Sequence, residues 1–314
     1  MSKISVIVPF YNVEKTISSC LRNLAWQTHE DIEIILINNA STDHSADIAK
    51  DCANTFPDKM RVIDLKENKG VGAAKNAGLK EASGDYIVFV DNDGVLETTM
   101  VEKMFDVATK DNCDMVEGTA YIPGINMLML QTPLDCVGKL DADKKATLIA
   151  RGGLFTTRLF KKELFEGITF RENVIHEDSE NLIKVILKAD SVGVTNDIVF
   201  KYNSGAAYSK ASNDPLNIHK SLSDAMTVIN EEFLKGGIIN DDKIKEAIIF
   251  QLMQHYIDAM FNVHNSNGRF TSKTIKFYQD ELKQLKKKLS LPAVEDNEFA
   301  KQKFSAKDKE LYTK

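Results

Sequence analysis

Two carboxylates one residue apart, Asp91 and Asp93, are the residues of this sequence best suited to chemistry. They follow five consecutive apolar or aromatic residues, 86–90, and Gly94 comes directly after them. Carboxylate oxygens beside backbone carbonyls form a hard site that suits Mg²⁺ or Mn²⁺ held together with substrate phosphates. Asp, Asn and Gly are also common turn residues, so the pair alone is as consistent with a turn as with a metal site.

A second acidic pair, Glu177 and Asp178, precedes a predicted helix with apolar residues at Leu182 and Ile186. A carboxylate placed near a substrate hydroxyl can remove its proton as a general base. Acids are also favoured in the first turn of any helix by the helix dipole. Taken alone, this pair is explained by the helix start, but together with the Asp91 pair it indicates catalysis.

Four predicted strands alternate with helices in the first part of the chain, at residues 4–8, 32–37, 60–65 and 86–90. Pro9 is expected to end the first strand because it has no N–H to give to a sheet. Asn12 is expected to cap the helix that follows, and a helix over residues 73–82 precedes the fourth strand. This alternation predicts an α/β fold with a mostly parallel sheet covered by helices on both faces.

Polar or turn-forming clusters follow three of these strands, at positions 9–12, 38–43 and 91–94. The carboxyl ends of parallel strands meet at one edge of a sheet, and open α/β sheets bind their ligands there. The sequence therefore predicts one site at this edge. Neither G-x-G-x-x-G after the first strand nor G-x-x-x-x-G-K-[ST] is present, which argues against a dinucleotide site and a P-loop.

The composition is that of a soluble globular protein, with 43% hydrophobic and 27% charged residues. A formal net charge of −6 gives no indication of nucleic-acid binding. Four scattered cysteines without a C-x-x-C pair are typical of a reducing compartment, so a cytoplasmic location is expected. Neither a membrane-spanning apolar stretch nor a signal peptide is recognisable.

Several motifs occur in a fixed order: V-I-V-P-F-Y-N, N-N-A-S-T-D, N-K-G-V-G-A-A-K-N-A-G and S-G-D-Y-I-V-F-V-D-N-D, with H-E-D at 176–178. Together they resemble the inverting nucleotide-sugar glycosyltransferases of family 2, of the bacterial polysaccharide and teichoic-acid type. The resemblance covers residues 1 to about 210. It implies the Rossmann-like GT-A fold and transfer of a sugar from a UDP-sugar to a hydroxyl of a glycan, a polysaccharide precursor or a protein-linked glycan.

The resemblance also implies roles on the nucleotide side of the site. Pro9 and Tyr11 would flank the nucleobase. Asn39 stands where the family has an aspartate that accepts from uracil N3, and Asn68 and Lys75 would lie beside the base and the diphosphate.

On the chemical side, Asp91 would approach the ribose or the metal, and Asn92 would belong to the same nucleotide-sugar contacts. Asp93 would ligate the Mn²⁺ or Mg²⁺ that bridges the two phosphates. Asp178 would supply the catalytic base, and Glu177 would orient the site.

Four residues depart from the family pattern. Asn39 replaces an aspartate and adds N–H donors, and Lys75 replaces an arginine and lacks its planar fork. Gly94 replaces a frequent third aspartate, and Asn203 follows Tyr202 where a basic residue is common. These departures keep open a non-catalytic module that binds a nucleotide sugar or a partner. A nucleotidyltransferase is a third interpretation, but its Gly- and Arg-rich loop after the first strand is absent.

Residues 1–212 are predicted to be the catalytic domain and residues 213–314 a helical subdomain, with helices at 216–234, 243–263, 272–289 and 299–312. The subdomain is expected to contact the acceptor, a second copy of the chain or the periphery of a membrane, where Lys283 and 286–288 form a basic run. Residues 121–137, low in charge and broken by Pro and Gly, are predicted to be a loop over the acceptor, a glycan or lipid-linked glycan.

Overall fold

The structure is a computed structural model that describes residues 2–92, 94–153, 155–202, 215–266 and 270–313. The chain divides into two compact units. The first contains Met1–Leu140 and Gly153–Ala207, and the second contains Asp141–Gly152 and Tyr208–Lys314. The predicted domain boundary between residues 212 and 213 lies outside the described residues, and residues 141–152 group with the second unit.

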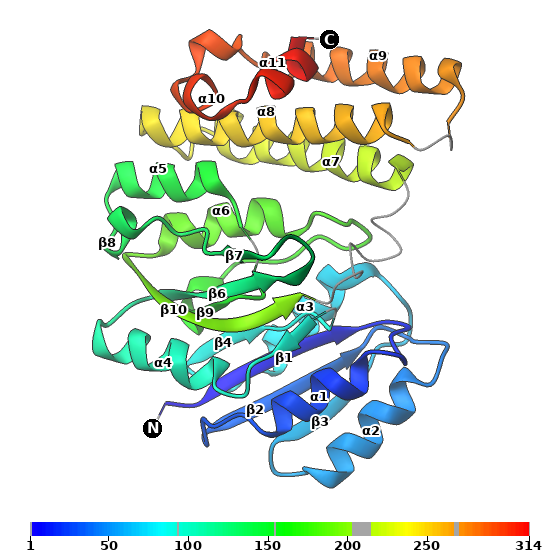
Figure 1. The fold of residues 1–314 in the computed structure, drawn as a ribbon, viewed down its shortest axis with the longest axis vertical. Coiled ribbons are helices and arrows are strands. Elements are labelled where there is room, and N and C mark those ends of the chain that lie inside the picture. The colour runs from blue at the N-terminus through cyan, green and yellow to red at the C-terminus, as the bar shows by residue number, and fades with distance from the viewer. Residues whose placement is uncertain (1, 93, 154, 203–214, 267–269, 314) are drawn as a thin grey trace. The chain divides into compact units, whose positions relative to one another are not determined.

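Within the described residues, ten strands of the first unit form one sheet (Figure 1). Its main path has the order β3-β2-β1-β4-β9-β6-β10-β5, while β7 pairs with β6 and β8 with β10. The strands are β1 (Ile4–Phe10), β2 (Ile32–Asn38), β3 (Met60–Asp64), β4 (Tyr86–Phe89), β5 (Gly94–Leu96), β6 (Met115–Ile122), β7 (Met127–Met129), β8 (Gly138–Lys139), β9 (Arg158–Lys161) and β10 (Ser191–Tyr202).

The first four strands are parallel, with Ile4 of β1 opposite Ile32 of β2 and Tyr86 of β4. β9 runs antiparallel to both β4 and β6, so β6 points the same way as β4. The ends of β1, β2, β4 and β6 therefore meet at one side of the sheet, which we call the carboxyl edge. The opposite side, where these strands begin, is the amino edge.

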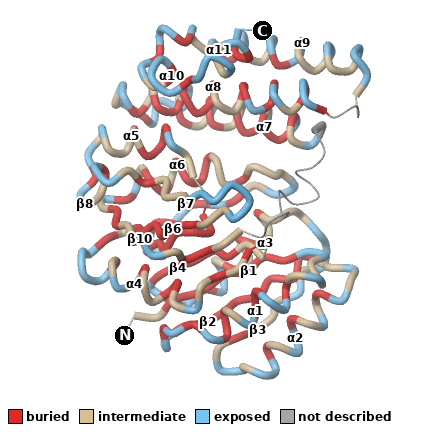
Figure 2. Tube along the Cα trace, viewed as in Figure 1, coloured by how far each residue is buried: buried red, intermediate tan, exposed pale blue. Residues whose placement is uncertain are grey.

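Helices of the first unit cover both faces of the sheet. On one face, alternate strand residues such as Val6 form a buried cluster that includes Leu21 and Met104. On the other face, Ile7 meets Gly78 of α3. Figure 2 shows the buried strands between these helices. The helices of this unit are α1 (Ile17–Ala25), α2 (Ser45–Thr55), α3 (Gly70–Glu81), α4 (Met100–Lys110) and α6 (Asp178–Lys188).

β1 continues through Pro9, so the expectation that Pro9 ends this strand was wrong. The pairing of β1 with β4 stops at Ile7 and Phe89, and the carbonyl of Ile7 accepts a hydrogen bond from Val90. Because strand residues turn alternately to their two neighbours, the nitrogen of Pro9 faces the same side, beyond the last paired residue. Its missing N–H therefore removes no ladder hydrogen bond.

Asn12 does not cap the following helix, because α1 begins only at Ile17. It adopts a φ of 52°, and its Oδ1 accepts from the backbone N–H of Thr42 at 2.8 Å. Its own N–H donates to Ser41 Oγ at 3.2 Å. Asn12 thus joins the loops after β1 and β2 at the carboxyl edge.

Residues 121–137 are not a plain loop, contrary to expectation. β6 extends to Ile122, a 3₁₀ turn follows at Pro123–Ile125, and β7 returns antiparallel to β6. We call residues 120–129 the β6–β7 hairpin. Ile125 and Leu128 at its tip are 66% and 61% exposed.

The second unit consists of helices, and the apolar stripe of α8 is buried at Ile248, Leu252 and Tyr256. Lys286 of the basic run turns inward, with Nζ 2.5 Å from the carbonyl oxygen of Tyr312. Among the described residues, no helix is both long and apolar enough to cross a membrane. The elements are α5 (Ala142–Arg151), α7 (Pro215–Ile229), a π-helical turn (Asn230–Lys235), α8 (Asp242–His264), α9 (Ser272–Lys288), α10 (Glu298–Lys303) and α11 (Ala306–Thr313).

Candidate active site

The loops after β1, β2 and β4 are bonded to one another at the carboxyl edge. Asn92 donates from Nδ2 to the carbonyl of Pro9 at 3.0 Å. Asn39 donates from its backbone N–H to the carbonyl of Phe10 at 2.9 Å. Tyr11 keeps 43% of its surface exposed, so its ring has a free face on which a planar group can stack.

Asn39 and Asn68 are brought into contact by the loops after β2 and β3. The Nδ2 group of Asn39, a buried residue, donates to Asn68 Oδ1 at 2.9 Å and to the carbonyl of Gly70 at 3.0 Å. Both amide hydrogens are therefore used within the protein. What Asn39 can offer a ligand is its Oδ1, which already accepts from the backbone N–H of Lys69 at 3.4 Å and has a second lone pair for another donor.

Asp91 follows β4 and is half-buried. Its Oδ2 accepts a hydrogen bond from the hydroxyl of Thr156, a residue that no sequence motif singled out. Asp93, the other acid of the predicted metal pair, lies outside the described residues. Within the parts of the chain that the structure describes, no group of three or more His, Cys, Asp or Glu side chains could hold a metal ion. Asp91 can offer one hard oxygen to a metal ion, and a complete donor set would need further oxygens, such as those predicted for Asp93.

Gly94 packs against Phe200, which explains why no third acid stands here. A Cβ at residue 94 would lie 2.1 Å from Cζ of Phe200 and 2.7 Å from the carbonyl oxygen of Lys201. β5 runs antiparallel to β10 at this point, with Gly94 opposite Tyr202. Asn203, the other departure in this region, lies outside the described residues.

Lys75 of α3 reaches the two acids at the start of α6. Its Nζ is 2.9 Å from Glu177 Oε1 and 2.5 Å from Asp178 Oδ1. The side chains of Lys75 and Glu177 are each 3% exposed, whereas that of Asp178 is 29% exposed. Asp178 is therefore the member of this cluster that a substrate can reach.

Three phenylalanine rings surround the same ammonium group. The centroids of Phe89, Phe155 and Phe170 lie 5.7, 5.5 and 5.3 Å from Lys75 Nζ. Such rings attract a desolvated cation through their negative faces. The resemblance implied a place for Lys75 beside the base and the diphosphate, but the structure directs its ammonium group to the acids of α6.

The pKa values of the two buried groups, Lys75 and Glu177, are both raised. Burial by itself would lower the pKa of Lys75, but the negative charges of Asp178, Glu177 and Asp91 outweigh it and raise that pKa. Burial raises the pKa of Glu177, an effect that Lys75 opposes and Asp178 reinforces. One ammonium group thus serves several carboxylates, and Lys75 stays charged.

Two glycines bring α3 close enough for Lys75 to reach this position. Gly72 and Gly78 stand three residues before and after it, on the same face of the helix. A Cβ at Gly72 would lie 2.0 Å from the carbonyl oxygen of Arg171, and one at Gly78 would lie 2.3 Å from Cγ2 of Ile7. Gly78 therefore sets the distance between α3 and the sheet, and Gly72 sets the distance between α3 and the segment at residues 170–171.

A buried ion pair fixes the segment that returns from the β6–β7 hairpin. Glu117 accepts from the backbone N–H groups of Gln131 and Thr132 at 2.8 and 2.7 Å. Arg158 Nη2 lies 3.4 Å from Glu117 Oε2. Sequence patterns indicated neither charged residue, because a single acid within an expected strand carries no motif.

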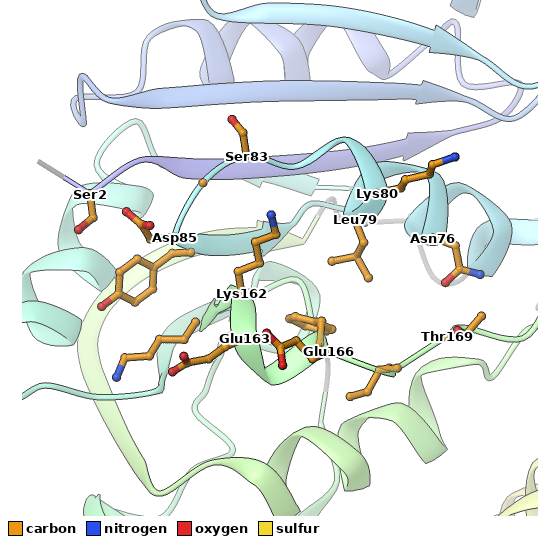
Figure 3. Close-up of a pocket in the computed structure, with 15 residues that line it drawn as sticks. Ser2, Asn76, Leu79, Lys80, Ser83, Asp85, Lys162, Glu163, Glu166 and Thr169 are labelled. Carbon is orange, nitrogen blue, oxygen red and sulfur yellow. The ribbon is translucent and has the colours of Figure 1, made fainter.

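A broad hollow of about 820 Å³ lies at the amino edge, lined by residues 83–86 and by parts of 161–169 (Figure 3). Two of its three lysines are bonded within the fold, since Lys161 Nζ is 2.7 Å from Asp114 Oδ1 and Lys162 Nζ is 2.6 Å from the carbonyl oxygen of Ala82. The hollow is at the start of β4, whereas Asp91 follows its end. We therefore place the candidate active site at the carboxyl edge.

A family model described as Glycosyl transferase family 2 matches residues 5–166, just over half of the chain. The chain belongs to glycosyl transferase family 2. This glycosyltransferase is 30% identical over 211 residues to glycosyltransferase GlyG of Streptococcus pneumoniae, which covers 63% of this chain and 70% of GlyG. It is 31% identical over 255 residues to the cholesterol galactosyltransferase of Borreliella burgdorferi, which covers 76% of this chain and 70% of that protein.

Two solved structures resemble this glycosyltransferase. S. aureus TarS 1–349 in complex with UDP-GlcNAc superposes with a TM-score of 0.71 at 19% identity, covering 99% of this chain and 89% of that chain. The mannosyltransferase PcManGT from Pyrobaculum calidifontis, in complex with GDP-Man and Mn²⁺, has a TM-score of 0.59 at 16% identity, covering 92% and 84%. These likenesses confirm the GT-A fold that the sequence motifs implied.

Proposed function

We propose that this glycosyltransferase transfers a sugar from a UDP-sugar to an acceptor hydroxyl, with inversion and with a divalent metal ion. The observation that carries the proposal is the position of Asp178, a partly exposed acid beside the buried side chains of Lys75 and Glu177. The charge of Asp91 also acts on Lys75, so the acids assigned to the donor and to the base gather around one point.

In the proposed reaction, Asp178 accepts the proton of the acceptor hydroxyl while the oxygen of that hydroxyl attacks the anomeric carbon. The bond between this carbon and the diphosphate breaks, and UDP leaves with the electron pair. Attack opposite the diphosphate inverts the anomeric centre. Lys75 holds Oδ1 of Asp178, which leaves Oδ2 for the hydroxyl, and Glu177 holds Lys75 in place.

Asp91 and Asp93 would hold a Mn²⁺ or Mg²⁺ ion, which when bound neutralises charge on the leaving diphosphate. Carboxylate oxygens are the ligands that both ions prefer. The complex of PcManGT with Mn²⁺ supports this assignment. Asn92, bonded to the carbonyl of Pro9, would keep the loop between the two acids in place.

For the donor, we assign the nucleobase to the site made by Pro9, Tyr11, Asn39 and Asn68. The Oδ1 of Asn39 would accept from the N3–H of uracil, because its amide hydrogens are already bonded to Asn68 and Gly70. The exposed ring of Tyr11 would stack on the base. The TarS complex with UDP-GlcNAc supports a UDP-sugar as donor.

For the acceptor, we propose a glycan or lipid-linked glycan that contacts the β6–β7 hairpin. The hairpin begins at the carboxyl edge and exposes Ile125 and Leu128 without a charged residue between them. Such a surface suits an acceptor with an apolar part, and a relative named as a cholesterol galactosyltransferase supports this choice. Leu128→Asp should raise the KM for a lipid-linked acceptor and leave UDP affinity unchanged.

We propose that the helical subdomain, residues 213–314, provides contacts with a second copy of the chain or with a membrane surface. Exposed apolar side chains support this role, with Phe277 58% and Ile238 66% exposed. Light scattering should report a lower association state for Phe277→Glu than for the wild type. If the wild type and Phe277→Glu are both monomeric, contact with a second copy is excluded and contact with a membrane is the remaining role. Co-sedimentation with vesicles measures that contact.

The proposal is tested by measuring UDP release from a panel of UDP-sugars with and without Mn²⁺. Release that requires one UDP-sugar, an acceptor and the metal is the expected result. Tight UDP-sugar binding with no release under any condition would instead show the non-catalytic binding module.

A further inference from the structure

One tight turn touches the site assigned to the donor and the cluster assigned to the base. The turn spans Phe155 to Arg158 and is closed by a hydrogen bond from the N–H of Arg158 to the carbonyl of Phe155 at 3.0 Å. The hydroxyl of Thr156 donates to Asp91 Oδ2. The ring of Phe155 lies 5.5 Å from Lys75 Nζ.

The turn is held rigidly by its surroundings. The ring of Phe155 packs against those of Phe89, Phe160 and Phe170, at centroid distances of 5.6, 5.2 and 5.6 Å. The carbonyl of Thr157 accepts from the N–H of Gly118 in β6 at 2.9 Å. The hydroxyl that reaches Asp91 therefore comes from a fixed support and not from a mobile loop.

A carboxylate binds a ligand more tightly when it is already held in the orientation that binding requires. Thr156 is only 2% exposed, so its hydroxyl has little access to water and is directed to Asp91. With Oδ2 engaged in this way, rotation of the Asp91 carboxylate is restricted and Oδ1 remains for another partner. Restricting the carboxylate before the ligand binds reduces the side-chain conformational entropy that is lost on binding.

We propose that Thr156 is a positioning residue, whose hydroxyl orients Asp91 so that the free oxygen of this carboxylate meets the ribose or the metal of a bound nucleotide. This inference rests on the proposed donor site. It assigns to Thr156 a role that none of the sequence motifs covers.

The plain alternative is that Thr156 only fills space in the core. Thr156→Val separates the two roles, because valine keeps the shape and loses the hydroxyl. Thr156→Ser keeps the hydroxyl and loses a methyl group. Thr157→Val is the matched control, since Thr157 is 1% exposed and belongs to the same turn.

The experiment measures UDP binding by calorimetry, with Mn²⁺ and with EDTA, and the melting temperature of each variant. Thr156→Val should weaken Mn²⁺-dependent UDP binding about 10–100-fold, the usual effect of removing a group that orients a ligand residue. Thr156→Ser should restore affinity close to that of the wild type. Thr157→Val should bind UDP as the wild type does, whatever its melting temperature.

Equal UDP affinity of Thr156→Val and the wild type, with binding lost in Asp91→Asn, would overturn the positioning role. Equal weakening by Thr157→Val would assign the effect to packing of the turn and would also overturn it. If the wild type itself fails to bind UDP, the donor assignment is wrong and the role of Thr156 falls with it. The three results are distinct, so each failure is traced to its own assumption.

Discussion

Two of the glutamates buried in the first unit, Glu33 near the amino edge of the sheet and Glu177 near the carboxyl edge, are held in opposite ways. At the amino edge, Glu33 of β2 accepts hydrogen bonds from Ser5, Arg61 and Ser83 at 2.6 to 2.7 Å. Burial alone would raise the pKa of Glu33, but these donors outweigh burial and lower the pKa to about 2. Glu33 is therefore charged at neutral pH and fully bonded.

Glu177, near the carboxyl edge, accepts far fewer hydrogen bonds than Glu33 does. Its Oε1 accepts from Lys75, which also serves Asp178, and its Oε2 has no hydrogen-bond partner among the described residues. Burial raises the pKa of Glu177, and Asp178 adds to this against the effect of Lys75. The comparison shows that hydrogen-bond donors, and not burial alone, decide whether the pKa of a buried carboxylate is lowered or raised.

The largest effect is expected from Asp178→Asn. This substitution tests whether the cluster of Lys75, Glu177 and Asp178 carries out the reaction. The amide cannot take a proton at neutral pH, so sugar transfer should fall about 10²–10⁴-fold, the usual contribution of a positioned general base. UDP affinity should stay close to that of the wild type. Initial rates of UDP release measure the first effect and calorimetry the second.

Glu33→Gln is the matched control for that experiment, because it changes a buried acid at the other edge. Its transfer rate should equal that of the wild type under conditions where both are folded. A normal rate in Asp178→Asn would show that the base lies elsewhere.

The next effect is on stability, from Lys75→Met. Removing one partner of a buried ion pair leaves charge uncompensated, and the free energy of unfolding should fall by about 3–5 kcal/mol. Urea unfolding measures this loss. Adding Glu177→Gln to Lys75→Met should recover part of the lost stability. If the double variant is less stable than Lys75→Met, the description of Lys75 as the shared partner of Glu177 and Asp178 is contradicted.

A smaller effect is expected from Glu33→Gln at neutral pH, with a loss of about 1.5–3 kcal/mol for hydrogen bonds to a charged group. Its pH dependence is more specific. The pKa of Glu33 falls from 4.5 in the unfolded chain to about 2 in the fold, so its stabilisation is complete above pH 4.5 and is lost as the pH falls toward 2. Acid unfolding of Glu33→Gln should lack this contribution, and an unchanged acid transition would contradict the assignment.

The smallest effect is expected from Glu177→Gln. The folded pKa of Glu177 is raised, so the folded state holds a proton that the unfolded state has lost above pH 4.5, and stability falls as the pH rises from there. Glutamine removes this fall and still offers an oxygen to Lys75. Stability at pH 7 should be unchanged or slightly higher, the reverse of Glu33→Gln, and thermal melting between pH 5 and 8 checks the sign.

The sequence predicted the first four strands closely because each is rich in β-branched and other apolar residues, and β3 was expected at 60–65 and is found at Met60–Asp64. Local signals failed where tertiary contacts decide. Pro9 remains in β1 because the pairing with β4 has already ended, while the pairing with β2 continues. Asn12 bonds to the loop after β2 instead of capping α1. The strand β7 at Met127–Met129 was missed because it is short and has no alternating pattern.

The site shows the same division. The motifs put Asn39 and Asn68 on the same side of the site, where the structure finds them bonded, and they put Glu177 and Asp178 at the start of a helix, where α6 begins. The direction of the Lys75 side chain does not, because it depends on three rings from distant parts of the chain. Thr156 had no sequence signal at all, since its only distinction is a contact across 65 residues.

The contact between Gly94 and Phe200 makes the order of substitutions matter in any change of this site. An acid cannot be accepted at residue 94 while the ring of Phe200 fills the space, 2.1 Å from where a Cβ would be. The ring must be replaced and the carbonyl oxygen of Lys201, 2.7 Å from the same Cβ, must shift, and Phe200→Ala alone would cost about 3–5 kcal/mol of stability. A variant with a third aspartate is thus separated from this sequence by an unstable intermediate, and evolution by single steps would first require stabilising changes elsewhere.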